Sequence, residues 1–187
     1  MTAFGFAPIN TSDGSDYHGK MRDVILDDGA DAFIGDMLIL GGTALAADEF
    51  PRLTPAASAA AGNTLKGALV SIYPDFTNEG SLVTNFHDAS VQGDGIGKVC
   101  WGEDVIFAAR EDADTSAIDG TTIGGSVDLI TGTGDTISGM SGMALDSSSA
   151  ALDKVQALNL LQIDLQQGNA FGLSGGAIFH VSINPVA

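Results

Sequence analysis

Short apolar runs separated by turns rich in glycine and aspartate set the pattern of this chain. The clearest run is 177–183, where Phe179, Val181 and Ile183 alternate with Ile178, His180 and Ser182. A period of two residues places alternate side chains on opposite faces, so this run predicts a strand with one buried face.

Other apolar runs also predict strands, because each is short and ends at residues that favour turns. The interior pair Gly35-Asp36 predicts a bulge or bend, and the connection 102–104 predicts a hairpin between its flanking strands. The predicted strands are 24–26, 32–40, 65–73, 82–86, 98–101, 105–109, 126–131 and 158–165.

Helical structure is expected to be brief. The acidic stretch 111–119 predicts one short turn, and another short helix is expected to start near 146–149. The Ala/Ser-rich stretch 53–62 admits a further turn, which Pro55 and Gly62 keep short. The expected fold is therefore all-β, a β-barrel or β-sandwich of about ten short strands with one or two short helices.

The first 19 residues differ from the rest and predict an extended N-terminal arm, followed by a single β domain over 20–187. They combine spaced apolar side chains with a polar Thr-Ser-Asp-Gly-Ser-Asp run that does not favour a regular element. Two interpretations stay open: a frayed terminus, or a segment that orders against a partner. In the second interpretation the contact residues are Phe4, Phe6, Pro8 and Ile9.

Charge excludes several classes of partner. The 187 residues include seven Lys+Arg and 24 Asp+Glu, which gives a formal net charge of −17. Twenty of the acids are Asp, a residue that favours turns over helix interiors. Nucleic-acid binding needs clustered bases that release counterions, and anionic membrane surfaces would repel this chain. We therefore predict neither nucleic acid nor membrane as a partner.

The distribution of apolar and charged residues bears on compartment and on strand position. Cys100 is the single cysteine, so no intrachain disulfide is expected, and no apolar run reaches the roughly 18 residues of a membrane span. The start lacks the features of a signal peptide, which predicts synthesis in the cytoplasm. Beyond Lys154 the only formally charged side chain is Asp164, which predicts central, well-covered strands.

The candidate nucleophile and metal-binding motifs lack the residue spacing that such sites require. Gly172-Leu173-Ser174-Gly175-Gly176 matches G-x-S-x-G, but a strand-like run follows it and no acid lies downstream. The three histidines, at 18, 87 and 180, lack metal-ligand spacing with one another or with Cys100. We expect Cys100 to be a core residue and His180 a cross-strand or partly exposed side chain.

Acidic stretches are candidate calcium sites. Asp112-x-Asp114-x-Ser116 opens like an EF-hand loop, but Ala117 and Ile123 stand where Gly and Glu are required. The group at 27, 28 and 31 fits a solvated turn equally well, and whether any acidic loop binds calcium stays open. We predict no catalytic, cofactor-binding or metal-binding residues, and no enzyme activity.

Several stretches carry a resemblance to one family. The start, Ala-Phe-Gly-Phe-Ala-Pro-Ile, is similar to an Ala-Phe-Gly-Leu/Phe-x-Pro-Val start, and 32–37 is similar to a hydrophobic-Gly-Asp-Pro-Val segment with Met37 in place of Pro. Together these stretches resemble the small head proteins of tailed bacteriophages. The stretches are 3–9, 32–37, 127–136, 138–148, 160–163 and 179–184.

The resemblance implies a capsid decoration, or cement, protein with a mainly β fold. It implies that the protein binds the major capsid protein at capsomer junctions on the exterior of the virion, with copies of itself as a trimer or dimer. The alternative from the residues is a non-catalytic β-sandwich that binds carbohydrate or another ligand. Such modules usually display exposed aromatic side chains, and one Trp and two Tyr argue against that alternative.

Overall fold

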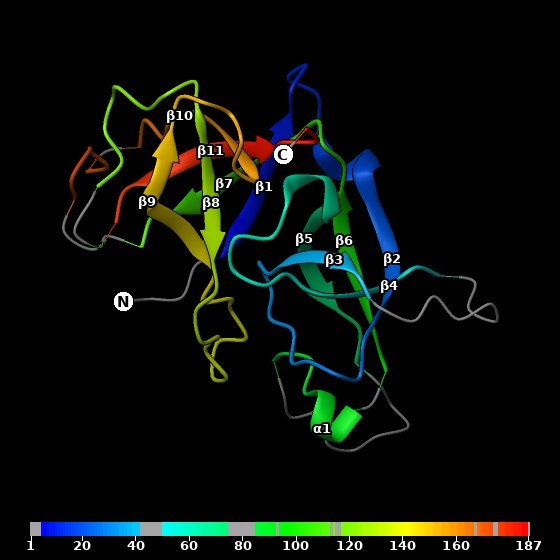
Figure 1. Cartoon of the computed structure of the whole chain (residues 1–187). Helices are drawn as coiled ribbons and strands as arrows, with labels where there is room; N and C mark the ends of the chain where they lie inside the picture. Colours follow the sequence, from blue (N-terminus) through cyan, green and yellow to red (C-terminus); the bar gives the residue numbers. More distant parts are fainter. Residues whose placement is uncertain are drawn as a thin grey trace.

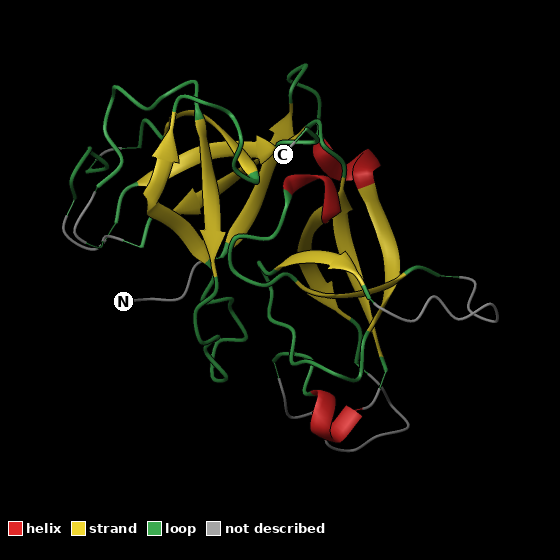
Figure 2. Ribbon diagram, in the orientation of Figure 1, coloured by secondary structure: helices red, strands yellow, loops and turns green. Residues whose placement is uncertain are grey.

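The fold is all-β, as predicted. The computed structural model describes residues 5–41, 50–74, 85–92, 94–112, 114, 117–166, 168–173 and 176–186. In these parts of the chain, eleven strands form two sheets that lie beside each other (Figure 1). Strands and loops make up nearly all of the fold, and the few helical segments are short (Figure 2).

Five strands close into a small barrel in the order β2-β4-β3-β5-β6 and back to β2. The pair β2 and β4 is parallel, and the other pairs are antiparallel. Its interior is apolar and includes Val24, Leu38, Leu53, Leu69 and Val99, all buried. The strands are β2 (Met21–Leu26), β3 (Met37–Leu40), β4 (Arg52–Pro55), β5 (Leu65–Ile72) and β6 (Gly95–Trp101).

The other six strands form an antiparallel sheet in the order β1-β7-β11-β10-β8-β9. A bridge between Glu111, directly after β7, and Leu145 on β9 makes the sheet curl back on itself. The charge-poor end of the chain supplies the two middle strands, as predicted. The strands are β1 (Phe6–Thr11), β7 (Val105–Arg110), β8 (Ser126–Ile130), β9 (Ala144–Ala151), β10 (Leu158–Ile163) and β11 (Ile178–Ile183).

One hydrophobic core joins the two sheets. Phe107 and Phe179 enter it from the six-stranded sheet, while Met37, Ala68 and Cys100 enter it from the barrel. Each of these side chains is fully buried. Burial of apolar area contributes roughly 25 cal/mol per Å², so this shared core holds the barrel against the sheet.

The arm predicted for 1–19 is wrong for its described part. Residues Phe6–Thr11 are strand β1, which pairs with β7 at the edge of the six-stranded sheet. Phe6 is a core residue, because pairing of β1 with β7 places its side chain in the core shared by the two sheets. Tyr17–Lys20 then forms a 3₁₀ turn, and residues 1–4 lie outside the described residues.

The hairpin predicted around 102–104 is also wrong. The strands β6 and β7 do follow each other there, but β6 pairs with β2 and β5, whereas β7 pairs with β1 and β11. The chain therefore crosses from the barrel to the sheet at Gly102, whose φ is 142°. The turn signal marked a connection between strands correctly, but such a signal does not state which strands pair.

Helical structure is shorter than expected. The helix expected from 146–149 is absent, since these residues belong to strand β9, and the described residues of 111–119 contain no helix. The helical segments are Tyr17–Lys20, Gly62–Thr64 and α1 (Ala89–Gln92). No helix in the described part of the chain has the length and apolar character needed to cross a membrane. Most of the strand expected at 82–86 lies outside the described residues.

The bend predicted at Gly35-Asp36 is confirmed. Gly35 has a φ of 95°, a value that glycine adopts without strain, and β3 begins only at Met37. The carbonyl of Gly35 accepts a hydrogen bond from the Phe6 N–H at 2.8 Å. The bend therefore ties the first strand of the sheet to the barrel.

Candidate functional site

The four predicted contact residues of the N-terminal segment differ in how far the fold buries them. Phe4 lies outside the described residues, Phe6 is buried in the core, and Pro8 is half-buried on the edge strand. Ile9 is 37% exposed and faces outward. Of the four residues, Ile9 is therefore the described one that offers an apolar surface to a partner.

Ile9 lines a shallow hollow of about 460 Å³ on the outer face of the six-stranded sheet. Ala108 of β7 and Leu165, the second residue after β10, supply the rest of its apolar wall. Leu165 is 87% exposed, which is unusual for so large an apolar side chain. The remaining wall is polar and consists of Gln162, Asp164, Gln166 and His180.

Hydrogen bonds fix the polar wall of this hollow. His180 Nε2 lies 3.2 Å from Asp164 Oδ2, and Gln162 Nε2 lies 3.0 Å from His180 Nδ1. Asp164 also accepts the Gln166 N–H at 2.9 Å. The prediction that His180 is a cross-strand, partly exposed side chain is confirmed.

The hollow combines an apolar part with a polar part. Its polar wall carries internal hydrogen bonds, while Leu165 is open to solvent and Ile9 is partly so. Such an arrangement favours burial of apolar surface against a partner.

The sequence indicated Ile9 but missed Leu165. Residues 158–165 were expected to form one strand, which would have made Leu165 an ordinary strand residue. Instead the ladder between β10 and β11 shifts register between Leu160 and Gln162, and β10 ends at Ile163. A bulge changes which side chains face outward, and alternation alone does not reveal it.

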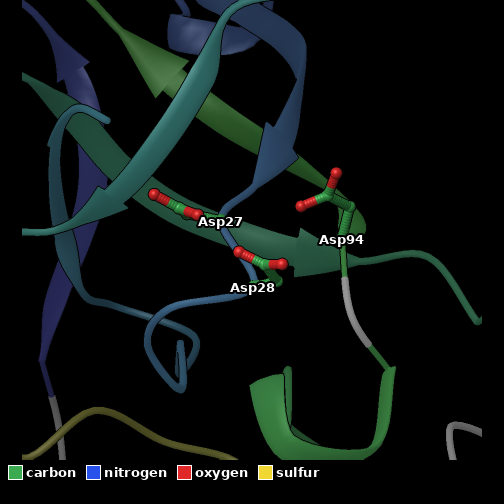
Figure 3. A group of neighbouring side chains, drawn as sticks. All are labelled: Asp27, Asp28 and Asp94. Carbon is green, nitrogen blue, oxygen red and sulfur yellow. The ribbon is translucent and has the colours of Figure 1, made fainter. Parts of the chain in front are cut away.

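A first group of acids gathers at one end of the barrel. Asp27 and Asp28 directly follow β2 and Asp94 directly precedes β6, and Figure 3 shows their carboxylates around one space. One oxygen from each lies within 4.8 Å of the others. Oxygen ligands at this separation are of the kind that Ca²⁺ accepts.

The guanidinium of Arg52 already occupies this group. It donates to both oxygens of Asp94, at 2.6 Å for the Nη2 to Oδ2 bond, and its Nη1 lies 3.8 Å from Asp27 Oδ1. The hydrogen bond from Arg52 lowers the pKa of Asp94 below its usual value. A cation bound here would compete with Arg52, so the acidic group carries no metal assignment.

We expect Arg52→Met to destabilise the protein by about 1 to 2 kcal/mol at pH 7. Methionine keeps much of the apolar stem, but it leaves three carboxylates close together without their cation. The pKa of Asp94 is lowered in the folded state, so its stabilising contribution exists above its unfolded pKa and is lost as pH falls. The penalty of Arg52→Met should therefore shrink below about pH 4, as urea unfolding at pH 7 and pH 3.5 would reveal.

Lys20→Met is the matched control for this test. Lys20 pairs with Asp104 at 2.7 Å, but both side chains are about two-fifths exposed, whereas the Arg52 side chain is 8% exposed. Exposed ion pairs contribute about 0 to 1 kcal/mol. Equal losses for the two variants would contradict the role of Arg52 as the cation of this acidic group.

A second acidic group contains Asp112, Asp114 and Asp146, with one oxygen from each within 4.8 Å of the others. The hydroxyl of Ser147 donates to Asp112 at 2.7 Å and lies 2.9 Å from Asp114. This group joins the segment after β7 to strand β9. Ser116, the last residue of the EF-hand-like pattern Asp112-x-Asp114-x-Ser116, lies outside the described residues.

The other candidate catalytic or metal-binding residues do not form a common site among the described residues. His18 contacts Asp16 on the surface, and His87 is buried with Nε2 at 3.2 Å from the Asp27 carbonyl. Cys100 is a core residue, as predicted, and burial raises the pKa of its thiol to about 11. Ser174 lies outside the described residues.

Comparison with known proteins adds no relative. No family model, no curated protein and no solved structure matches this chain.

Proposed function

We propose that this protein is a structural virion protein that binds the major capsid protein on the outside of a bacteriophage head. It acts as a decoration, or cement, protein at capsomer junctions and occurs there as a trimer or dimer. The family resemblance of the sequence supports this class. The observation that carries the proposal is that the strongly exposed Leu165 and the partly exposed Ile9 line one hollow on the six-stranded sheet.

The physical properties of the chain fit that role. A cement protein needs a stiff body and a modest contact repeated many times over one shell, where effective concentration makes weak contacts strong. The shared core of the barrel and sheet supplies the stiffness. The net charge of −17 keeps free protein soluble and repels packaged nucleic acid.

A particle-binding experiment tests the contact surface. We expect Leu165→Asp to weaken co-sedimentation with heads made of the major capsid protein by about tenfold or more, because burial of a leucine contributes about 1.5 to 3 kcal/mol. Ile9→Asp should act in the same direction. Leu165 is 87% exposed, so the thermal unfolding of free Leu165→Asp should stay near that of the wild type.

Ile137→Asp provides the matched control. Ile137 lies between β8 and β9, outside the hollow, and is 84% exposed compared with 87% for Leu165. The control should bind heads as the wild type does. If Leu165→Asp binds heads as well as Ile137→Asp does, the proposed contact surface is wrong. The whole proposal fails if wild-type protein neither co-sediments with heads nor stabilises them.

A further inference from the structure

A second hollow lies on the barrel, with no residue in common with the first. It measures about 610 Å³ and opens at the start of β2, at the segment that enters β4 and at the end of β6. This volume falls in the range of small-molecule sites. Its wall is formed by Met21, Arg22, Asp23, Phe50, Pro51 and Trp101.

Two aromatic rings form much of the apolar wall. Trp101 is the single tryptophan of the chain, and Phe50 is 44% exposed. Trp101 also packs with Ile72 against the buried cluster of the barrel, so its position is fixed from behind. A held indole ring beside an exposed phenyl ring offers flat apolar surface for a ligand.

The charges of this hollow differ from those of the chain as a whole. Asp23 Oδ1 accepts a hydrogen bond from Tyr73 at 3.3 Å and lies 3.3 Å from Lys98 Nζ, so its carboxylate is compensated. The Arg22 side chain forms no hydrogen bond or ion pair with any residue that the structure describes. An arginine with no partner among the described residues, in a chain of net charge −17, is a ready contact for an anion.

We infer that this hollow binds a sugar ring, and preferentially one that carries a carboxylate. The apolar C–H face of a pyranose ring can lie on the aromatic side chains of Trp101 and Phe50. The guanidinium of Arg22 can donate two parallel hydrogen bonds to the sugar carboxylate. One Trp and two Tyr in the sequence argued against a carbohydrate site, but the fold places Trp101 and Phe50 in one hollow with Arg22.

Titration of the wild-type protein with methyl glucuronide and methyl glucoside tests this inference. Trp101 is the sole tryptophan, so its fluorescence reports on this hollow alone. We expect a saturable change with both sugars and about tenfold tighter binding of the glucuronide. Phe50→Ala should weaken both about tenfold, and Arg22→Gln should remove the preference between them.

Phe171→Ala is the control, because Phe171 has the same 44% exposure but lies outside the hollow. It should leave both titrations unchanged, and thermal unfolding should verify that every variant is folded. The inference is overturned if neither sugar gives a saturable change or if Phe171→Ala weakens binding as much as Phe50→Ala. It is also overturned if the fluorescence follows protein concentration without sugar, which would mark a contact between copies. Head binding is measured separately, so its outcome does not affect this test.

Discussion

Asp36→Asn should stabilise the protein at neutral pH, and its advantage over the wild type should grow by about 2 kcal/mol between pH 4 and pH 7. This is an unusual expectation for a buried residue with good hydrogen bonds. It follows from the position of Asp36 between the barrel and the six-stranded sheet, where its side chain is almost entirely covered.

The partners of Asp36 are few for a buried carboxylate. One oxygen accepts the Phe33 N–H at 2.8 Å, and the other accepts the hydroxyl of Ser141. No cation is among the partners of its side chain that the structure describes. Burial disfavours the charged form more than these two bonds favour it, and the pKa of Asp36 is raised to about 6.

The sign of the pH effect follows from this raised pKa. Between the ordinary value of 3.8 and about 6, the folded state holds a proton that the unfolded state has lost. Stability from this group is therefore complete below pH 3.8 and is lost as pH rises through 6. Each pKa unit corresponds to about 1.4 kcal/mol, so ionised Asp36 costs about 3 kcal/mol at neutral pH.

Asparagine removes the ionisation while keeping the shape. Its carbonyl can accept the Phe33 N–H, and its amide can donate to the Ser141 oxygen. Urea unfolding of both proteins at pH 4, 5, 6 and 7 measures the effect as a widening difference with pH. A constant difference over this range would contradict the raised pKa of Asp36.

Asp135→Asn is the control with the opposite sign. The backbone N–H of Ile137 and the Ser138 hydroxyl lower the pKa of Asp135, so its contribution is present above the ordinary pKa and lost as pH falls. Removing its charge should therefore destabilise the protein at pH 7 and become harmless in acid. The two variants make the same chemical change, but the effect of Asp135→Asn should change only below its ordinary pKa of 3.8, where the effect of Asp36→Asn is already constant.

Glu111→Ala should destabilise the protein by about 3 to 5 kcal/mol, the largest loss that we expect from one side chain. Glu111 is fully buried at the point where the curled sheet closes beside β9. One carboxylate oxygen accepts the Ile118 N–H at 2.8 Å, and the other accepts the Ala177 N–H at 3.0 Å. The single side chain thereby fastens two segments that are distant in sequence.

Truncation of Glu111 would leave two buried donors without an acceptor and a cavity in their place. Glu111→Gln leaves no cavity and so measures the hydrogen-bond contribution alone. Its amide nitrogen would face a backbone N–H donor, which it cannot accept. A buried donor left unsatisfied costs about 1 to 3 kcal/mol, so Glu111→Gln should lie between the wild type and Glu111→Ala in urea unfolding.

Glu103→Gln makes the same change at an exposed position of the connection between β6 and β7. It should alter stability by less than about 0.5 kcal/mol. If Glu111→Gln is as harmless as Glu103→Gln, then the two backbone bonds of Glu111 do not fasten the sheet.

Much of the fold could be predicted because the signals were local. The alternation of 177–183, the bend at Gly35-Asp36 and the turn chemistry of Asp and Gly depend on neighbouring residues only, and all of them appear in the structure. The central position of β10 and β11 followed from the scarcity of charge after Lys154. These features need no knowledge of what lies across the sheet.

The sequence predictions were wrong where contacts with residues distant in sequence determine the local structure. Asp146 and the serines after it favour a helix start locally, yet pairing with β8 makes them part of β9. The outcome at Phe6 also depends on a distant partner, since pairing with β7 draws it into the core. Pairing and burial override weak local preference because they involve many more contacts.

The sequence by itself determined that this protein is an acidic all-β chain with turns at its Asp and Gly residues, since composition and period act locally. Only the tertiary structure decided which strands pair, that β6 and β7 belong to different sheets, and which side chains meet on the surface. The hollow beside Ile9 collects residues from four separate parts of the chain, and the hollow beside Trp101 collects them from three. Such gatherings depend on contacts between residues far apart in sequence, and those contacts exist only once the chain has folded.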